Sequence, residues 1–166
     1  TRVGVPPGVG IMEHIYTLSA AQAQQADDIV RQIEMASVLQ AEANSGMDQL
    51  FSHLEQFPWK LALITNNHRQ AMEHVVSRFD LHFDLLLSRE DALLKPAPDL
   101  VLLALERFGI TAQEAVFVGD GRYDREACAA AGVHYIHLVH DATRPREGDV
   151  IYSLEQLPGR LEALQR

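Results

Sequence analysis

Short apolar runs alternate with longer segments of helical periodicity from Trp59 to the end of the chain, and this alternation restricts the fold more than any other feature. The segments between the runs have the length of about 10 to 15 residues that joins parallel strands. We predict strands over residues 61–65, 84–88, 134–139 and 150–153, and a further strand that ends at Asp120. We predict helices over residues 68–79 and 98–108, directly after Asp120, and from about Leu154 onward. Right-handed crossovers between such strands give an α/β fold, a Rossmann-like parallel sheet with helices on both faces.

The start of the chain has a different character, because it carries helix and loop signals and no strand signal. Residues 1–10 are rich in Gly and Pro, which interrupt regular structure. Residues 11–16 can form a short helix, and Ser19 is a suitable N-cap for a long helix that extends to about Ala43. We therefore divide the chain into a helical part with its connecting loop, residues 1–45, and an α/β part, residues 46–166.

Composition and charge narrow the class of protein. The apolar content of 47% and the charged content of 22% are those of an ordinary soluble globular protein. A formal charge of −9 without a basic run disfavours nucleic acid and anionic membranes as partners. Cys128 is the only cysteine, so an intrachain disulfide is excluded, and we find neither a signal peptide nor an apolar run of the roughly 18 residues that a membrane span needs. We expect a cytoplasmic protein that is a monomer or a homodimer and binds neither nucleic acid nor membranes.

Two carboxylates follow the strand that ends at Asp120. The sequence Val118-Gly119-Asp120-Gly121 places Asp120 at the strand end, and Asp124 lies one helical turn further on. Ligands of open α/β sheets bind outside the carboxyl ends of the strands, so both side chains could converge on one hard cation, and oxygen ligands of this kind favour Mg²⁺. The alternative is ordinary turn chemistry, with Asp124 facing the positive end of a helix dipole.

Two other strand ends carry groups that suit a phosphate. The first predicted strand ends in Thr65-Asn66-Asn67, which offers a hydroxyl and the N–H groups at the start of the next helix. Lys95 follows the second strand and is held out of helical geometry by Pro96, in a chain that has two lysines and twelve arginines. The alternatives are an Asn-rich turn and a solvated lysine. Arg89 and Arg31 are weaker candidates for contact with a substrate's leaving group.

In combination, these strand ends resemble the haloacid dehalogenase (HAD) superfamily of hydrolases, and within it the members similar to phosphoglycolate phosphatase, which have a helical cap inserted after the first strand. Ile64-Thr65-Asn66-Asn67 resembles the second motif of the family, and Lys95-Pro96-Ala97-Pro98-Asp99 resembles the third. Val118-Gly119-Asp120 with Asp124 resembles the fourth. The resemblance implies a HAD-like core with a small helical cap at residues 1–45.

The resemblance also implies a chemistry, namely phosphoryl transfer to an aspartate and hydrolysis of the aspartyl-phosphate. Thr65 and the backbone of Asn66 would hold oxygens of a small phosphorylated substrate, and Lys95 would neutralise them. Thr65 and Lys95 are thus the expected catalytic residues. Asp120 would ligate Mg²⁺, and Asp124 would support the metal through water or pair with Lys95.

The chain departs from the family at its first motif, an Asp-x-Asp at the end of the first strand that supplies the nucleophile and the general acid. The sequence contains no Asp-x-Asp. Since residues 1–10 look like the middle of a loop, we expect the chain to begin between this strand and the cap. We therefore expect a sheet without its central first strand and a chain that is inactive alone. The alternatives are a non-catalytic phosphate-binding or regulatory module and a sugar phosphomutase of the same fold.

Overall fold

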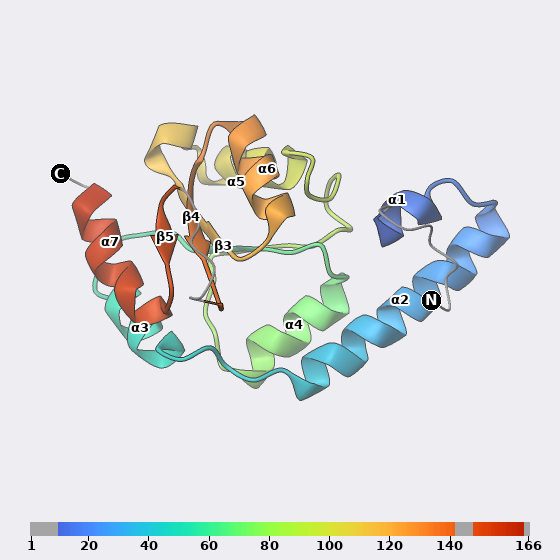
Figure 1. The fold of residues 1–166 in the computed structure, drawn as a ribbon, viewed down its shortest axis with the longest axis horizontal. Helices are drawn as coiled ribbons and strands as arrows, with labels where there is room; N and C mark the ends of the chain where they lie inside the picture. The colour runs from blue at the N-terminus through green and yellow to red at the C-terminus, as the bar shows by residue number, and fades with distance from the viewer. Residues whose placement is uncertain (1–9, 142–147, 165–166) are drawn as a thin grey trace.

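The computed structural model describes residues 10–141 and 148–164 (Figure 1). Its parallel strands form a sheet in two parts. In the first part, β1 (Ala62–Ile64) pairs with β2 (Leu85–Leu87). In the second part, β4 (His134–Leu138) lies between β3 (Val116–Gly119) and β5 (Val150–Ile151). Every pairing is parallel, with Leu63 opposite Leu86 and Val118 opposite Ile136.

Helices connect the strands, as the alternation in the sequence predicts. Those of the α/β part are α3 (Met47–Leu54), α4 (Arg69–Arg78), α5 (Asp99–Phe108), α6 (Arg122–Ala131) and α7 (Leu157–Leu164), with 3₁₀ turns at Ala112–Glu114 and Leu154–Gln156. The last strand is shorter than predicted, because Ser153 turns the chain and its Oγ accepts a hydrogen bond from the N–H of Glu155 at 3.2 Å.

Apolar side chains bury both faces of the larger sheet. On one face, α3 and α7 pack on β4 and β5 in a cluster that includes Ile136 and Ile151. On the other face, α5 and α6 pack on Phe117 and Tyr135, with Cys128 fully buried beneath them. The predicted α/β fold with helices on both faces of a parallel sheet is thereby confirmed.

The two parts of the sheet face each other across a gap between β1 and β3. The carbonyl of Leu61 and the N–H of Thr65 bond to the β2 side, so by the alternation of a strand the polar groups of Ala62 and Ile64 point to the opposite edge. None of the described strands pairs with that edge or with the facing edge of β3. Side chains alone join the two parts here, as where Ile64 and Phe117 share one cluster.

The remaining helices, α1 (Ile11–Ile15) and α2 (Ala20–Gln40), form a pair that extends from the α/β part (Figure 1). Ile15, Ala26 and Val30 are the buried residues between them. The C-terminal half of α2 lies along α4, and the guanidinium of Arg78 donates to the carbonyls of Val38 and Leu39 at 2.8 and 2.7 Å.

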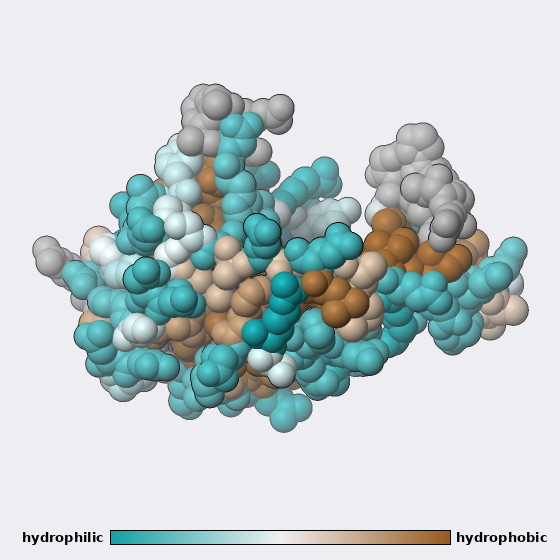
Figure 2. All heavy atoms as spheres, turned by 90° about the horizontal axis from the view of Figure 1, so that it is seen from below, coloured by the Kyte–Doolittle hydropathy of each residue, from teal (hydrophilic) through white to brown (hydrophobic). Residues whose placement is uncertain are grey.

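Apolar side chains also remain on the surface of this helical pair. Ile11, Ile33 and Leu39 are exposed there, and Figure 2 shows brown surface at this end of the molecule. Within the described part of the chain, none of the helices combines the length and the apolar composition that crossing a membrane requires.

Candidate active site

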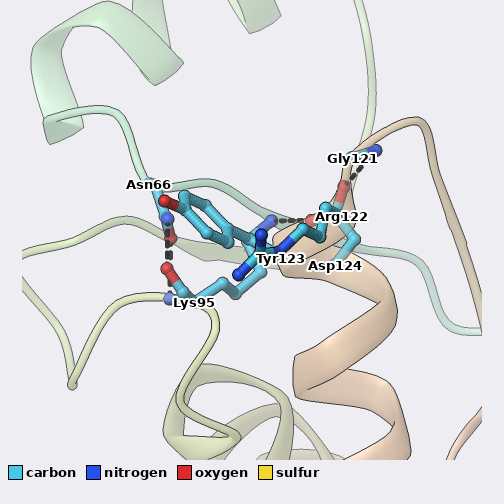
Figure 3. A pocket seen from close by; sticks show the side chains of 6 residues that line it. All are labelled: Asn66, Lys95, Gly121, Arg122, Tyr123 and Asp124. Carbon is cyan, nitrogen blue, oxygen red and sulfur yellow. Dashed lines mark hydrogen bonds and ion pairs between the residues drawn. The ribbon is translucent and has the colours of Figure 1, made fainter. Parts of the chain in front are cut away.

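The turn after β1 holds the backbone of Lys95 through the side chain of Asn66. The Asn66 amide donates from Nδ2 to the carbonyl of Lys95 at 2.7 Å and accepts at Oδ1 from the Lys95 N–H at 2.9 Å (Figure 3). The Thr65 hydroxyl oxygen accepts from the N–H of Asn67 at 3.1 Å, which closes the turn locally. Two segments that are distant in sequence are thus fixed to each other at the carboxyl end of β1.

The side chain of Lys95 reaches into the gap between the two parts of the sheet. Its Nζ donates to the carbonyl of Ile64 on the unpaired edge of β1 at 3.0 Å and to Oδ1 of Asp124 at 2.5 Å. The ammonium lies 5.3 Å from the ring centroid of Phe117, and the side chain is 8% exposed. An ammonium has three N–H groups, and two of them bond to these oxygens, while the third has no hydrogen-bond partner among the described residues.

Asp124 is held at the first turn of α6 by two contacts. One carboxylate oxygen meets Lys95, and the other accepts from the N–H of Gly121 at 3.1 Å. Gly119 leaves the space for this side chain, because a Cβ on Gly119 would lie 2.7 Å from Oδ2 of Asp124. A side chain at residue 119 would therefore push Asp124 away from Lys95.

A cavity of about 370 Å³ opens beside the Lys95–Asp124 pair. Its lining residues come from the turn after β1, the segment after β2 and the start of α6: Asn66, Lys95, Gly121, Arg122, Tyr123 and Asp124 (Figure 3). The Tyr123 ring is 42% exposed, and the Arg122 guanidinium lies 5.9 Å from its centroid and pairs with Glu126 at 2.7 Å. The cavity therefore combines an ammonium at its base with an aromatic ring at its surface.

Thr65 and Asp120, the other residues singled out in the sequence, do not line this cavity. The Asp120 carboxylate is 63% exposed and lies 3.4 Å from Nε2 of His140, and its backbone carbonyl lies 3.2 Å from Nε2 of His137. The structure thus brings Asn66, Lys95 and Asp124 together and leaves Asp120 on the adjacent surface. In the described residues, no set of three or more His, Cys, Asp and Glu side chains is arranged to hold a metal ion.

Two protonated side chains lie behind the site. Burial, reinforced by the charge of Asp124 and opposed by Lys95, raises the pKa of Cys128 to about 12. Burial also raises the pKa of Tyr135, with the charges of Asp124 and Asp120 adding to the effect, and its hydroxyl lies 2.8 Å from the Gly119 carbonyl. The Cys128 thiol is therefore not a nucleophile at neutral pH, and Tyr135 serves as a neutral donor that supports the loop after β3.

A second charged cluster, which the sequence did not indicate, lies between α2 and the strand-end loops. Arg89, a weak candidate for substrate contact, is 4% exposed and bonds to Asp27 at 2.7 Å and to Glu34. Glu34 also bonds to the backbone N–H and ring of His68. The available signal was the spacing of Asp27, Arg31 and Glu34, which places them on one face of a helix.

Comparisons with known proteins agree with this geometry. The sequence model of the haloacid dehalogenase-like hydrolase family matches residues 8–138. A haloacid dehalogenase-like hydrolase domain-containing protein of Arabidopsis thaliana is 27% identical over 97% of the chain, and the phosphoglycolate phosphatase of Escherichia coli is 34% identical over 55% of it. The chain spans 66% of the length of the first of these relatives and 40% of the second.

Solved structures show the same fold. CbbY from Rhodobacter sphaeroides, crystallised in complex with phosphate, superimposes with a TM-score of 0.69 at 22% identity, over 89% of this chain and 75% of that one. Because the family model covers most of the chain and the architecture agrees, the chain belongs to the haloacid dehalogenase-like hydrolases, a family that includes phosphatases.

Proposed function

We propose that the full-length protein containing this chain is a Mg²⁺-dependent phosphatase that hydrolyses a small phosphorylated metabolite through an aspartyl-phosphate. The observation that carries the proposal is the ammonium of Lys95, which is buried at the carboxyl ends of β1 and β3 and borders an open cavity. A buried cation with an unused N–H group can bind an anion. During phosphoryl transfer, negative charge is spread over the oxygens of the phosphoryl group, and such a cation would stabilise it.

The chain's own residues supply the binding of the phosphate. Lys95 would neutralise the phosphate oxygens, and Thr65 and the backbone N–H of Asn66 would donate to them at the carboxyl end of β1. The paired hydrogen bonds of Asn66 fix the backbone of Lys95 and would hold it in the same place when substrate binds. The relatives named phosphoglycolate phosphatase favour a small phosphorylated metabolite as the substrate.

The nucleophile would come from a strand inserted between β1 and β3. Central strands of a doubly wound sheet are buried on both faces. In this chain, β1 and β3 are instead less buried than β4 and β5. No residue of β1 or β3 is fully buried and Val116 is 38% exposed, whereas Ile136 of β4 and Ile151 of β5 are buried. A parallel strand in this gap would end beside Lys95, and we place the Asp-x-Asp of the family at its end, in a segment that precedes residue 1.

The residues present also fit a bound Mg²⁺. This cation takes one or two carboxylates and keeps several waters, with substrate phosphate completing the set. Asp120, with its exposed carboxylate, would hold the ion directly, whereas both oxygens of Asp124 are engaged and would reach it through water. When bound, the ion would supply positive charge for the phosphoryl oxygens.

We further propose that residues 1–45 act as a cap and residues 46–166 as the core. The helix α2 contacts the loops after β1 and β2, at the edge where the phosphate would bind. A cap there would exclude water while the phosphoryl group is attached to the enzyme.

The test compares the longer protein, which carries the Asp-x-Asp strand, with its Asp120→Asn variant and with the 166-residue chain. The longer protein should hydrolyse para-nitrophenyl phosphate only with Mg²⁺, and we expect Asp120→Asn to reduce kcat/KM by about 10³-fold or more. The chain alone should show no turnover, because it lacks the nucleophile.

Activity of Asp120→Asn within a few-fold of the parent would refute the metal assignment. Turnover by the 166-residue chain would mean that one of its own aspartates is the nucleophile. A longer protein that binds phosphate but never hydrolyses it would instead indicate a regulatory module.

A further inference from the structure

One face of α2 presents alternating charges to the loops at the carboxyl ends of β1 and β2. Asp27 bonds to Arg31 and to Arg89, both at 2.7 Å, and Arg31 bonds to Glu90 at 2.9 Å. Glu34 bonds to Arg89 through Oε1. The Asp27 and Glu34 side chains are 23% and 13% exposed. The cluster therefore joins α2 to the segment 88–91, with Arg89 buried, Asp27 and Glu34 partly buried, and Arg31 and Glu90 exposed at its rim.

Glu34 also satisfies the start of α4, a helix of the core. Its Oε2 accepts the backbone N–H of His68 at 3.0 Å and faces Nδ1 of the same residue. His68 is the N-cap of α4, its own side chain makes no capping hydrogen bond, and the first turn of α4 contains no acidic residue. A carboxylate from α2 thus accepts the N–H of the N-cap residue, as the Glu or Gln at the third helical position does in a capping box.

The tautomer of His68 follows from these contacts. Nδ1 faces a carboxylate, so it carries the proton, and Nε2 is buried without a hydrogen-bond partner among the described residues. Among the described residues, Glu34 is therefore the hydrogen-bond partner that orients the ring.

Arg89 explains how a carboxylate can lie so near a proposed phosphate site. An uncompensated negative charge at the start of α4 would repel the phosphate. The Arg89 guanidinium, 4% exposed, pairs with Glu34, and the Arg89 backbone N–H donates to the carbonyl of Asn67 at 3.2 Å. The same residue thus neutralises the carboxylate and fixes the turn from its other side.

We propose that Glu34 is a positioning residue for phosphate binding, which holds the turn of residues 65–68 in place from the cap helix. The path is short: Glu34 bonds to His68, two residues after Asn66, and Asn66 holds the backbone of Lys95. This inference rests on the proposed function. It means that the orientation of α2 and the affinity for the phosphate group are coupled.

The first arm of the test uses the full-length protein with Mg²⁺, para-nitrophenyl phosphate as substrate and inorganic phosphate as inhibitor. Glu34→Gln keeps the size of the side chain and removes its charge. The matched control is Asp28→Asn, which makes the same charge change on the exposed side of α2. We expect Glu34→Gln to raise KM and the Ki of phosphate together, by about tenfold, as for a weakened hydrogen bond to a charged group, with kcat within about threefold.

A purely structural clamp would give a different result. It would lower the melting temperature and the active fraction, and therefore the apparent kcat, while KM and the Ki of phosphate stayed at the parent values. That pattern, or an equal change in Asp28→Asn, would overturn the proposal.

The second arm does not depend on catalysis. Backbone amide hydrogen exchange of His68 should be slow in the parent and in Asp28→Asn, and at least about tenfold faster in Glu34→Gln. If the parent neither binds phosphate nor hydrolyses the ester, the proposed function fails, but faster exchange at His68 would still support control of the turn by Glu34. Unchanged exchange would refute it.

Discussion

Arg89 and Lys95 are two buried cations of one chain, and they differ in the number of carboxylates that they contact and in whether they border a cavity. The Arg89 side chain is 4% exposed and meets two carboxylates, those of Asp27 and Glu34. Lys95 is 8% exposed and meets one carboxylate, that of Asp124, together with one backbone carbonyl. Two carboxylates thus face the charge of Arg89, whereas one faces that of Lys95, which also keeps one N–H group without a hydrogen-bond partner among the described residues and borders a cavity.

The difference fits the chemistry of the two side chains. A guanidinium has a planar fork that can bind two carboxylates at once, here those of Asp27 and Glu34 on α2. An ammonium is a compact point charge that suits the oxygens of a phosphate. We infer that burial of a charge does not by itself indicate an active site, and that the unused N–H group of Lys95 beside a cavity is what makes it a candidate.

The largest effect should come from removing the charge of Lys95 in the full-length enzyme. Lys95→Met keeps the length of the side chain and leaves Asp124 without its cation, so the phosphoryl group would meet a negative site. We expect kcat/KM for para-nitrophenyl phosphate to fall by about 10³-fold or more. If Lys95→Met retains more than about a tenth of the parent activity, Lys95 has no larger part in catalysis than Arg89, and the distinction between the two cations is wrong.

Removing the charge of Arg89 should act mainly on stability. Arg89→Met leaves the partly buried Asp27 and Glu34 without their common partner, while Asp27 keeps Arg31, so the free energy of unfolding should fall by about 1 to 3 kcal/mol. Urea unfolding of the parent and the variant measures this directly. An equally large loss in Lys95→Met with none in Arg89→Met would reverse the assignment of the two cations.

Much of the fold was predictable from the sequence, because its signals are local. Apolar runs and turn residues placed the strands, and Gly109 and Gly132, both in left-handed conformation, end α5 and α6. Element ends were less well defined: the helix expected to reach about Ala43 ends at Gln40, and the strand expected over residues 150–153 ends at Ile151. Such ends depend on tertiary contacts, as where Arg78 binds the last carbonyls of α2.

The site was predictable only in part, because some of its contacts depend on tertiary packing. Sequence motifs identified Asn66, Lys95 and Asp124, because each follows a strand and the strand ends of a parallel sheet meet at one edge. Glu34 and His68 could not be paired from the sequence, because their contact depends on how α2 lies against the core. For Asp120 the motif identified the residue but not the position of its side chain, which is 63% exposed, outside the cavity, and lies beside His140.

The smallest effect, an acid dependence of stability, tests the Arg89 side of the comparison by itself. Burial alone would raise the pKa of Asp27, but the hydrogen bond from Arg31 and the attraction of Arg89 outweigh it, and the pKa is lowered. The unfolded chain then binds this proton more readily than the folded one, with an ordinary Asp pKa of about 3.9. The stabilisation is thus fully present above about pH 4 and is lost as the pH falls through the lower folded value. Melting temperatures of the parent should therefore decline below that pH more steeply than those of Asp27→Asn, whereas Asp28→Asn, an exposed change on the same helix, should follow the parent. Parallel curves for the parent and Asp27→Asn would show that the pairing of Asp27 with Arg31 and Arg89 contributes nothing to folding.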